Sequence, residues 1–171
     1  ALVSADRSED YFRWLGIRKD RIVHGYDAVS IDRIRKQVDQ KPAPEGCLFQ
    51  DRSFIVVARF VKKNNLKVAI EAYEKYRRLC VEIGQRHHKF VLCGDGEEGS
   101  ALKELVRTLK VDGVDFPGFC TAVEVSEHLS KGLCLVLPRI EEQLGLLVKE
   151  AWFWGLTIQR STSCGCNELL V

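Results

Sequence analysis

The sequence lacks three features that would each indicate a class of protein or its origin. It has no methionine, no apolar run of the ~18 residues that a membrane span needs, and no apolar N-terminal segment of the secretory type. The last two absences argue against a membrane-spanning or secreted protein and favour the cytoplasm. Because the chain starts at Ala1 and has no methionine, we expect it to be a fragment or a processed form.

The sequence also lacks the even cysteine count of a disulfide scaffold, since it has seven. Cys93 and Cys134 lie inside apolar runs, where a thiol behaves as a small buried hydrophobe, so we expect a reducing compartment. Cys164 and Cys166 have one residue between them and no second pair nearby, a poor pattern for zinc. The sequence therefore predicts no metal site.

The net charge of +2 gives no argument for a nucleic-acid partner, but the charges are unevenly distributed. Residues 1–90 carry 19 Lys and Arg against 12 Asp and Glu, whereas residues 91–171 carry 7 against 12. Complementary solvated faces are the simpler interpretation. The alternative is a basic front half that meets an anionic lipid surface or phosphate groups.

Short apolar runs alternate with longer amphipathic segments along the chain. The expected strands are Ile22–Gly25, Phe54–Ala58, Phe90–Cys93, Gly113–Phe116, Cys134–Leu137 and Leu156–Gln159, and the expected helices are Leu66–Cys80, Ser100–Leu109, Ala122–Leu129 and Leu144–Trp154. This alternation predicts an α/β fold, a Rossmann-like parallel sheet with helices on both faces. Ligands of such sheets bind in the loops at the carboxyl ends of the strands.

Residues 40–47 contain two prolines and read as a linker before the first core strand. We therefore expect residues 1–46 to be a lead-in from an inter-domain region, and residues 47–171 to be the Rossmann-like domain, cut short at its C-terminus. Thr121, followed by Glu124 three residues later, is a capping-box pattern for one helix start.

Two glutamates, Glu142 and Glu150, flank the start of the expected helix at 144–154. Eight residues at ~1.5 Å rise separate the two carboxylates by roughly 12 Å or less along the helix axis. That is too far for the ~5–10 Å carboxylate pairs of glycosidases, but it suits the two ends of one elongated ligand. The free N–H groups at the helix start favour a phosphate. From spacing alone, ordinary helix charges remain the simpler interpretation.

Ordered motifs around this pair change that interpretation. Glu142 to Glu150 resembles the E-x7-E signature of glycosyltransferase family 4, a retaining family with the two-domain GT-B fold. Further segments resemble that family's C-terminal, donor-binding domain in the same order: Gly25-Tyr26-Asp27, Val57–Phe60 with Asn65-Leu66, Phe90–Gly96, Val114–Phe119, and Gly155 with Gly165–Leu169. The match extends from about Ile22 onward.

The resemblance implies roles for the residues around the helix start. Glu150 would bind the ribose hydroxyls of a nucleotide. Glu142 would contact hydroxyls of the donor sugar, which makes it a candidate catalytic residue. The backbone amides of Leu144, Gly145 and Leu146 would hold the sugar and diphosphate groups, as the positive end of a helix dipole can.

The resemblance implies phosphate and base contacts on the other loops. Arg59, the second candidate catalytic residue, would neutralise the diphosphate through a planar, bidentate grip on its oxygens. Asn64 occupies the position where the family usually has a lysine, and Lys62 and Lys63 are the candidates to supply that charge, with Lys63 kept as the candidate donor-binding residue. The base would rest near Gly118–Cys120, with Gly118 and Phe119 as the candidate contacts.

The implied activity is retaining transfer of a sugar from a nucleotide-diphosphate donor. Negative charge develops on the leaving diphosphate, and an arginine with a helix N-terminus can stabilise it. We therefore expect no metal and no other cofactor. The implied partners are a missing N-terminal acceptor domain and an acceptor that is a saccharide or a membrane-linked glycan, consistent with a cytoplasmic protein or one peripheral at the cytosolic face of a membrane. The chain alone should show little transfer.

Departures from the family pattern keep an alternative open. Asn64 replaces the usual lysine, and a bulky Trp152-Phe153-Trp154 run follows Ala151. These changes are consistent with a nucleotide-binding or interaction module without transfer activity; we otherwise interpret the aromatic run as helix packing. A dehydrogenase is a weaker hypothesis, because the loop Arg59–Asn64 is not the glycine-rich turn that binds a dinucleotide.

Overall fold

A computed structural model describes residues 1–3, 6–25, 29–140 and 146–161. The elements in chain order are β1 (Leu2–Val3), α1 (Asp6–Trp14), η1 (Lys19–Arg21), β2 (Val23–His24), α2 (Ile31–Gln37), α3 (Ala43–Gly46), η2 (Phe49–Asp51), β3 (Ser53–Val57), η3 (Lys62–Asn64), α4 (Leu66–Glu82), β4 (Lys89–Cys93), α5 (Gly99–Thr108), β5 (Val114–Gly118), α6 (Ala122–Leu129), β6 (Gly132–Leu137), α7 (Leu146–Phe153) and β7 (Thr157–Arg160).

The main sheet contains five strands in the order β5-β4-β3-β6-β7, and every neighbouring pair is parallel. The chain runs outward from β3 to β5, then returns through α6 to the other side of β3 and continues to β7. The strand order therefore reverses between β3 and β6. The crevice at such a switch point, beyond the carboxyl ends of the strands, is where open α/β sheets bind ligands.

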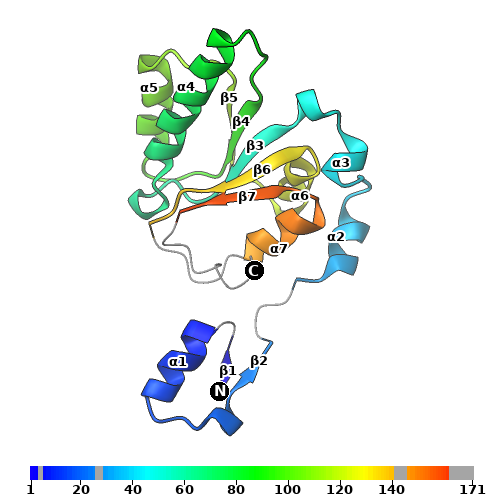
Figure 1. Cartoon of the computed structure of the whole chain (residues 1–171), viewed down its shortest axis with the longest axis vertical. Helices are drawn as coiled ribbons and strands as arrows, with labels where there is room; N and C mark the ends of the chain where they lie inside the picture. Colours follow the sequence, from blue (N-terminus) through cyan, green and yellow to red (C-terminus); the bar gives the residue numbers. More distant parts are fainter. Residues whose placement is uncertain (4–5, 26–28, 141–145, 162–171) are drawn as a thin grey trace.

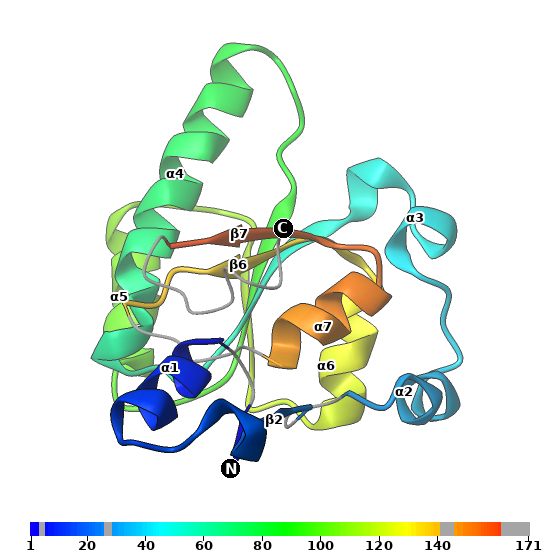
Figure 2. The same cartoon turned by 60° about the horizontal axis from the view of Figure 1, so that its bottom comes forward.

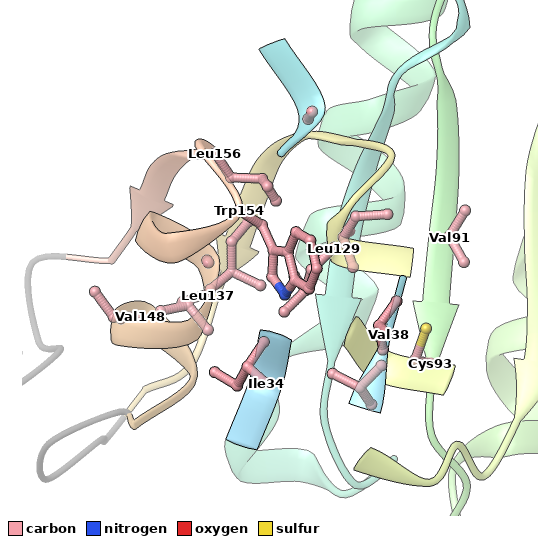
Figure 3. Packing of buried hydrophobic residues seen from close by; sticks show 14 residues of the cluster. Ile34, Val38, Val91, Cys93, Leu129, Leu137, Val148, Trp154 and Leu156 are labelled. Atoms are coloured by element: carbon pink, nitrogen blue, oxygen red, sulfur yellow. The ribbon is translucent and has the colours of Figure 1, made fainter. Parts of the chain in front are cut away.

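Each face of the sheet carries its own apolar core, because successive strand residues point to opposite faces. Ile55 and Val91 join a cluster with the helices α2, α6 and α7, centred on the buried Trp154 (Figure 3). Val56 and Leu92, the next residues along the same strands, join a second cluster with α4 and α5. Helices therefore cover both faces, as Figures 1 and 2 show and as the sequence predicts.

Most predicted core elements are confirmed to within about two residues. The prediction for α6 has the same bounds as the structure, Ala122–Leu129. Its capping box is present: the Glu124 amide donates to Thr121 Oγ1, and the Thr121 amide donates to a Glu124 carboxylate oxygen at 2.7 Å. The helix predicted from Leu144 is described only from Leu146, where α7 begins.

Residues 1–3 and 6–25 form a small unit that stands apart from the main sheet (Figure 1). In it β1 and β2 pair in parallel, Leu2 opposite Val23, and α1 connects them. The sequence predicts an extended segment at Ile22–Gly25 but not its partner, because two residues carry no readable pattern. Among the described residues, no helix has the length and apolar character to cross a membrane.

Candidate functional site

A hollow of about 220 Å³ lies at the carboxyl ends of the central strands, beside the switch point. Residues that end or follow β3, β4 and β5 line it: Val57, Ala58, Arg59, Cys93, Gly94, Asp95, Phe119 and Cys120. The lining thus contains a cation, a carboxylate, an aromatic ring and two thiols. Such a mixed lining suits a ligand with an anionic part and a flat apolar part.

Backbone contacts through Gly94 hold the three loops of the hollow together. The Gly94 amide donates to the carbonyl of Gly118 at 2.7 Å, and the Ala58 amide donates to the carbonyl of Cys93 at 3.0 Å. Gly94 adopts φ +143°, a conformation that favours glycine. A Cβ atom there would lie 1.9 Å from the Ala58 carbonyl oxygen, so the close approach of β3 and β4 requires glycine.

The loop after β3 presents a cation to the hollow. Arg59 is exposed, and within the described part of the chain no carboxylate forms an ion pair with it. The buried side chain of Asn64 donates a hydrogen bond from Nδ2 to the Arg59 carbonyl, and this bond holds the loop in place. The Ile140 amide donates to the carbonyl of Lys63 at 3.0 Å, which ties this loop to the one after β6. Arg59 is therefore presented from a braced backbone.

The loop after β5 contributes Phe119 and Cys120 to the lining. Phe119 is 81% exposed, an unusual position for a ring that could otherwise be buried. Cys120 is half-buried, and its thiol donates to the Gly118 carbonyl at 3.4 Å. Burial raises the pKa of the Cys93 thiol well above its usual range, and the neighbouring Cys120 raises it further. The Cys93 thiol is therefore protonated at neutral pH in the absence of a metal.

Glu150 lies on α7 and is half-buried. Burial raises the pKa of its carboxyl group, while the positive charge of Arg33 on α2 opposes that effect. A carboxylate that has lost part of its hydration accepts hydrogen bonds from a ligand at a smaller desolvation cost than a fully solvated one. Glu150 is thus suited to bind hydroxyl groups.

The structure brings together only part of the predicted site. Arg59 and Phe119 line the hollow, whereas the other described candidates lie outside its lining: Lys63 (exposed), Asn64 (buried), Gly118, Leu146 (40% exposed, at the start of α7) and Glu150. Glu142, Leu144 and Gly145 lie outside the described residues. The site residues predicted from the sequence do not include Cys93 or Asp95. Both lie at the end of a predicted strand, and that position could have indicated them.

The comparisons with known proteins agree with this architecture. The family model described as glycosyl transferases group 1 matches residues 39–171. No curated protein sequence matches the chain. Among solved structures, a pneumococcal O-GlcNAc transferase, GtfA, in complex with UDP and GlcNAc is 19% identical with a TM-score of 0.72, covering 99% of this chain and 31% of that one.

Two further structures have the same fold. WaaG, a glycosyltransferase of lipopolysaccharide biosynthesis, is 17% identical with a TM-score of 0.73, over 99% of this chain and 46% of that one. The C-terminal domain of a group 1 glycosyl transferase, LpcC of Francisella tularensis, is 17% identical with a TM-score of 0.59, over 84% and 71%. The chain thus spans less than half the length of GtfA and WaaG. Because the family model matches most of the chain, this protein belongs to the group 1 glycosyl transferases.

Proposed function

We propose that this chain is the donor-binding part of a retaining, metal-independent glycosyltransferase of the family 4 type. The observation that carries the proposal is the hollow at the carboxyl ends of β3, β4 and β5, whose lining includes the exposed cation of Arg59 and the exposed ring of Phe119. A nucleotide diphosphate has matching parts, an anionic diphosphate and a flat base. The UDP bound in the complex of GtfA is consistent with this class of ligand.

In the proposed reaction, Arg59 faces the leaving diphosphate. Breaking the bond between the sugar and the diphosphate leaves positive charge on the sugar and negative charge on the diphosphate oxygens. A fixed guanidinium stabilises that negative charge as it develops, without reorganisation at the moment of reaction. The hydrogen bond from Asn64 to the Arg59 carbonyl holds the backbone from which the guanidinium extends. Glu142 and the amides of residues 144–146 keep their proposed roles at the sugar and diphosphate.

Phe119 and Glu150 are proposed to bind the nucleoside. A base stacked on an exposed aromatic ring gains about 1–3 kcal/mol. The half-buried carboxylate of Glu150 would accept the ribose hydroxyls. Arg33 on α2 supports this role, because its charge favours the ionised carboxylate.

Transfer also requires an acceptor site, which we propose lies on a second domain. The β1–β2 pair supports this view, since two strands alone make a marginal sheet and gain stability from further strands. The length of GtfA and WaaG is consistent with a second domain. The acceptor, a saccharide or a membrane-linked glycan, and a cytoplasmic or membrane-peripheral location stay predictions.

Calorimetric titration of the chain with UDP, GDP and ADP, each compared with the corresponding nucleotide sugar, tests the donor site. We expect at least one nucleotide to bind with a stoichiometry of one. If none of the three nucleotides binds, the proposed donor site is wrong.

Replacing Arg59 by alanine should weaken binding of the preferred nucleotide diphosphate by about tenfold to a hundredfold. Hydrogen bonds to charged groups contribute roughly 1.5–3 kcal/mol, and each 1.4 kcal/mol is about tenfold in affinity. The matched control is Arg78→Ala, an exposed arginine on α4 that pairs with Glu74. The measurement is calorimetry at fixed ionic strength. Equal affinities for the two variants would contradict the role of Arg59.

Nucleotide affinity should fall at acidic pH in a way that depends on Glu150. Because burial raises the pKa of this carboxyl group, it begins to take up protons at a higher pH than an exposed glutamate, and the protonated form accepts hydroxyl groups less well. Glu150→Gln should remove this part of the pH dependence and leave the part that belongs to phosphate protonation. Arg33→Ala should move the decline to higher pH. Parallel affinity–pH profiles for all three proteins would contradict the assignment.

A second candidate function is nucleotide binding without transfer. The observation in its favour is Asn64, which stands where the family usually has a lysine. Its side chain is neutral, buried and hydrogen-bonded to the Arg59 carbonyl, so it offers no charge to a diphosphate. Release of nucleoside diphosphate from the preferred nucleotide sugar, measured on a chain that includes the acceptor domain, separates the candidates. Binding of the nucleotide sugar without release of nucleoside diphosphate would favour a nucleotide-binding module without transfer activity.

A further inference from the structure

Three side chains of types that bind metals come together from separate elements, and two of them belong to the lining of the hollow. Cys93 ends β4, Cys120 lies in the loop between β5 and α6, and His128 lies in the last turn of α6. Their sulfur and imidazole nitrogen atoms all lie within 4.8 Å of one another. The sequence separates the three residues by up to 35 positions, so no spacing pattern reveals them; only the fold brings them together.

The spacing fits one tetrahedral ion. At Zn–S distances of about 2.3 Å, two sulfur ligands of a tetrahedral Zn²⁺ lie roughly 3.8 Å apart, within the observed limit. Two thiols and an imidazole also form one of the known three-ligand sets, to which an exogenous group adds a fourth ligand. The donor set suits a thiophilic cation rather than Mg²⁺, which prefers oxygen ligands and accompanies phosphates.

A tetrahedral ion has four ligands, and we expect the fourth to be a solvent molecule or another group from outside the three side chains. The Glu124 carboxylate on α6 accepts hydrogen bonds from the amide and hydroxyl of Thr121 in the capping box, so it is already engaged. Cys93 and Cys120 also line the hollow, so we expect the fourth position of the ion to face it. In Figure 3, Cys93 lies at the border of the apolar cluster.

We propose that Cys93, Cys120 and His128 form a binding site for one thiophilic divalent cation of the Zn²⁺ class. Binding displaces the protons of the two thiols, so that two thiolates and one neutral imidazole hold the ion and two protons enter solvent. The two thiolates and the imidazole are the ligands of the ion, and no step of the proposed transfer reaction uses it. The proposal rests on the geometry of these three side chains and not on the proposed nucleotide binding.

The test is titration of the reduced chain with Co²⁺ in the absence of air and of competing thiols. Cys164 and Cys166 are first replaced by serine, so that the signal belongs to the remaining cysteines. We expect one equivalent of Co²⁺ to give the visible and thiolate charge-transfer bands of tetrahedral sulfur coordination, and Zn²⁺ to displace it. The absence of these bands would overturn the proposal.

Variants assign the ligands. Cys120→Ser and His128→Gln should each weaken Co²⁺ binding by at least about tenfold, since even the outer-shell partners of metal ligands contribute 10–100-fold. The matched control is Cys80→Ser, which replaces a buried thiol on α4 outside the cluster. His128→Gln changes a half-buried side chain, so its fold should survive even where a cysteine variant unfolds. Unchanged affinity in His128→Gln, with the fold intact by circular dichroism, would overturn the three-ligand site.

Discussion

Trp154→Ala is expected to lower the free energy of unfolding by about 3–5 kcal/mol. The side chain is 1% exposed and lies at the centre of the core between the sheet and the helices α2, α6 and α7 (Figure 3). Its indole Nε1 has no hydrogen-bond partner among the described residues, so the loss comes from packing and from the cavity left behind. Two distant segments of the chain meet at this residue: the Ala43 amide donates to the Trp154 carbonyl at 2.9 Å.

The chain offers a matched control two residues away. Trp152 lies on α7 but is 40% exposed, so Trp152→Ala should cost about 1 kcal/mol or less. Urea unfolding gives the free energy of unfolding of both variants. Circular dichroism is the better signal, because removing a tryptophan alters the fluorescence. Equal losses for the two variants would contradict the placement of Trp154 in the core.

Gly94→Ala is expected to destabilise the fold by about 2–6 kcal/mol and to abolish nucleotide binding. The new Cβ would lie 1.9 Å from the Ala58 carbonyl oxygen and 2.9 Å from its carbonyl carbon, where only backbone movement can relieve the overlap. The φ of +143° adds strain of about 1–3 kcal/mol, and overpacking adds about as much. Because Gly94 lines the hollow and bonds to Gly118, moving it also displaces the loops of the site.

Gly84→Ala separates strain from overlap. Gly84 also has a positive φ, +67°, but nothing lies within 4 Å of the place where its methyl group would stand, so only about 1–2 kcal/mol is expected. Thermal unfolding of both variants, followed by calorimetry with the preferred nucleotide, gives the comparison. If Gly94→Ala lowers the free energy of unfolding by no more than Gly84→Ala does, the close approach of β3 and β4 described above is wrong.

The local signals of the sequence predicted the core elements well. The apolar run at Phe54–Ala58 and its counterparts indicate strands buried on both faces, and the Thr121–Glu124 capping box marks the start of α6 to the residue. Such signals are short-range: periodicity, caps and turns act within a few residues. They also predicted that loops after strands would hold the site, since that follows from parallel pairing.

Other features depended on contacts between distant residues. The expected strand at Ile22–Gly25 contains β2, but β1 and its pairing with β2 escaped prediction because β1 is only two residues long. Asn64 reads in the sequence as a polar loop residue that faces a ligand, but its burial and its bond to the Arg59 carbonyl follow from how the loops pack. The influence of Arg33 on Glu150 joins two helices that lie more than a hundred residues apart.

By itself the sequence determined the class of fold, the order of the strands and helices along the chain, and the family motifs that predict a donor site. Only the tertiary structure decided that Arg59 and Phe119 share one hollow, that Glu150 is partly desolvated, and that two thiols and a histidine come together. The physical reason is that the preference of a segment for helix, strand or turn depends on residues that are neighbours in the sequence. A binding site, by contrast, is assembled where the carboxyl ends of strands from distant segments are brought side by side.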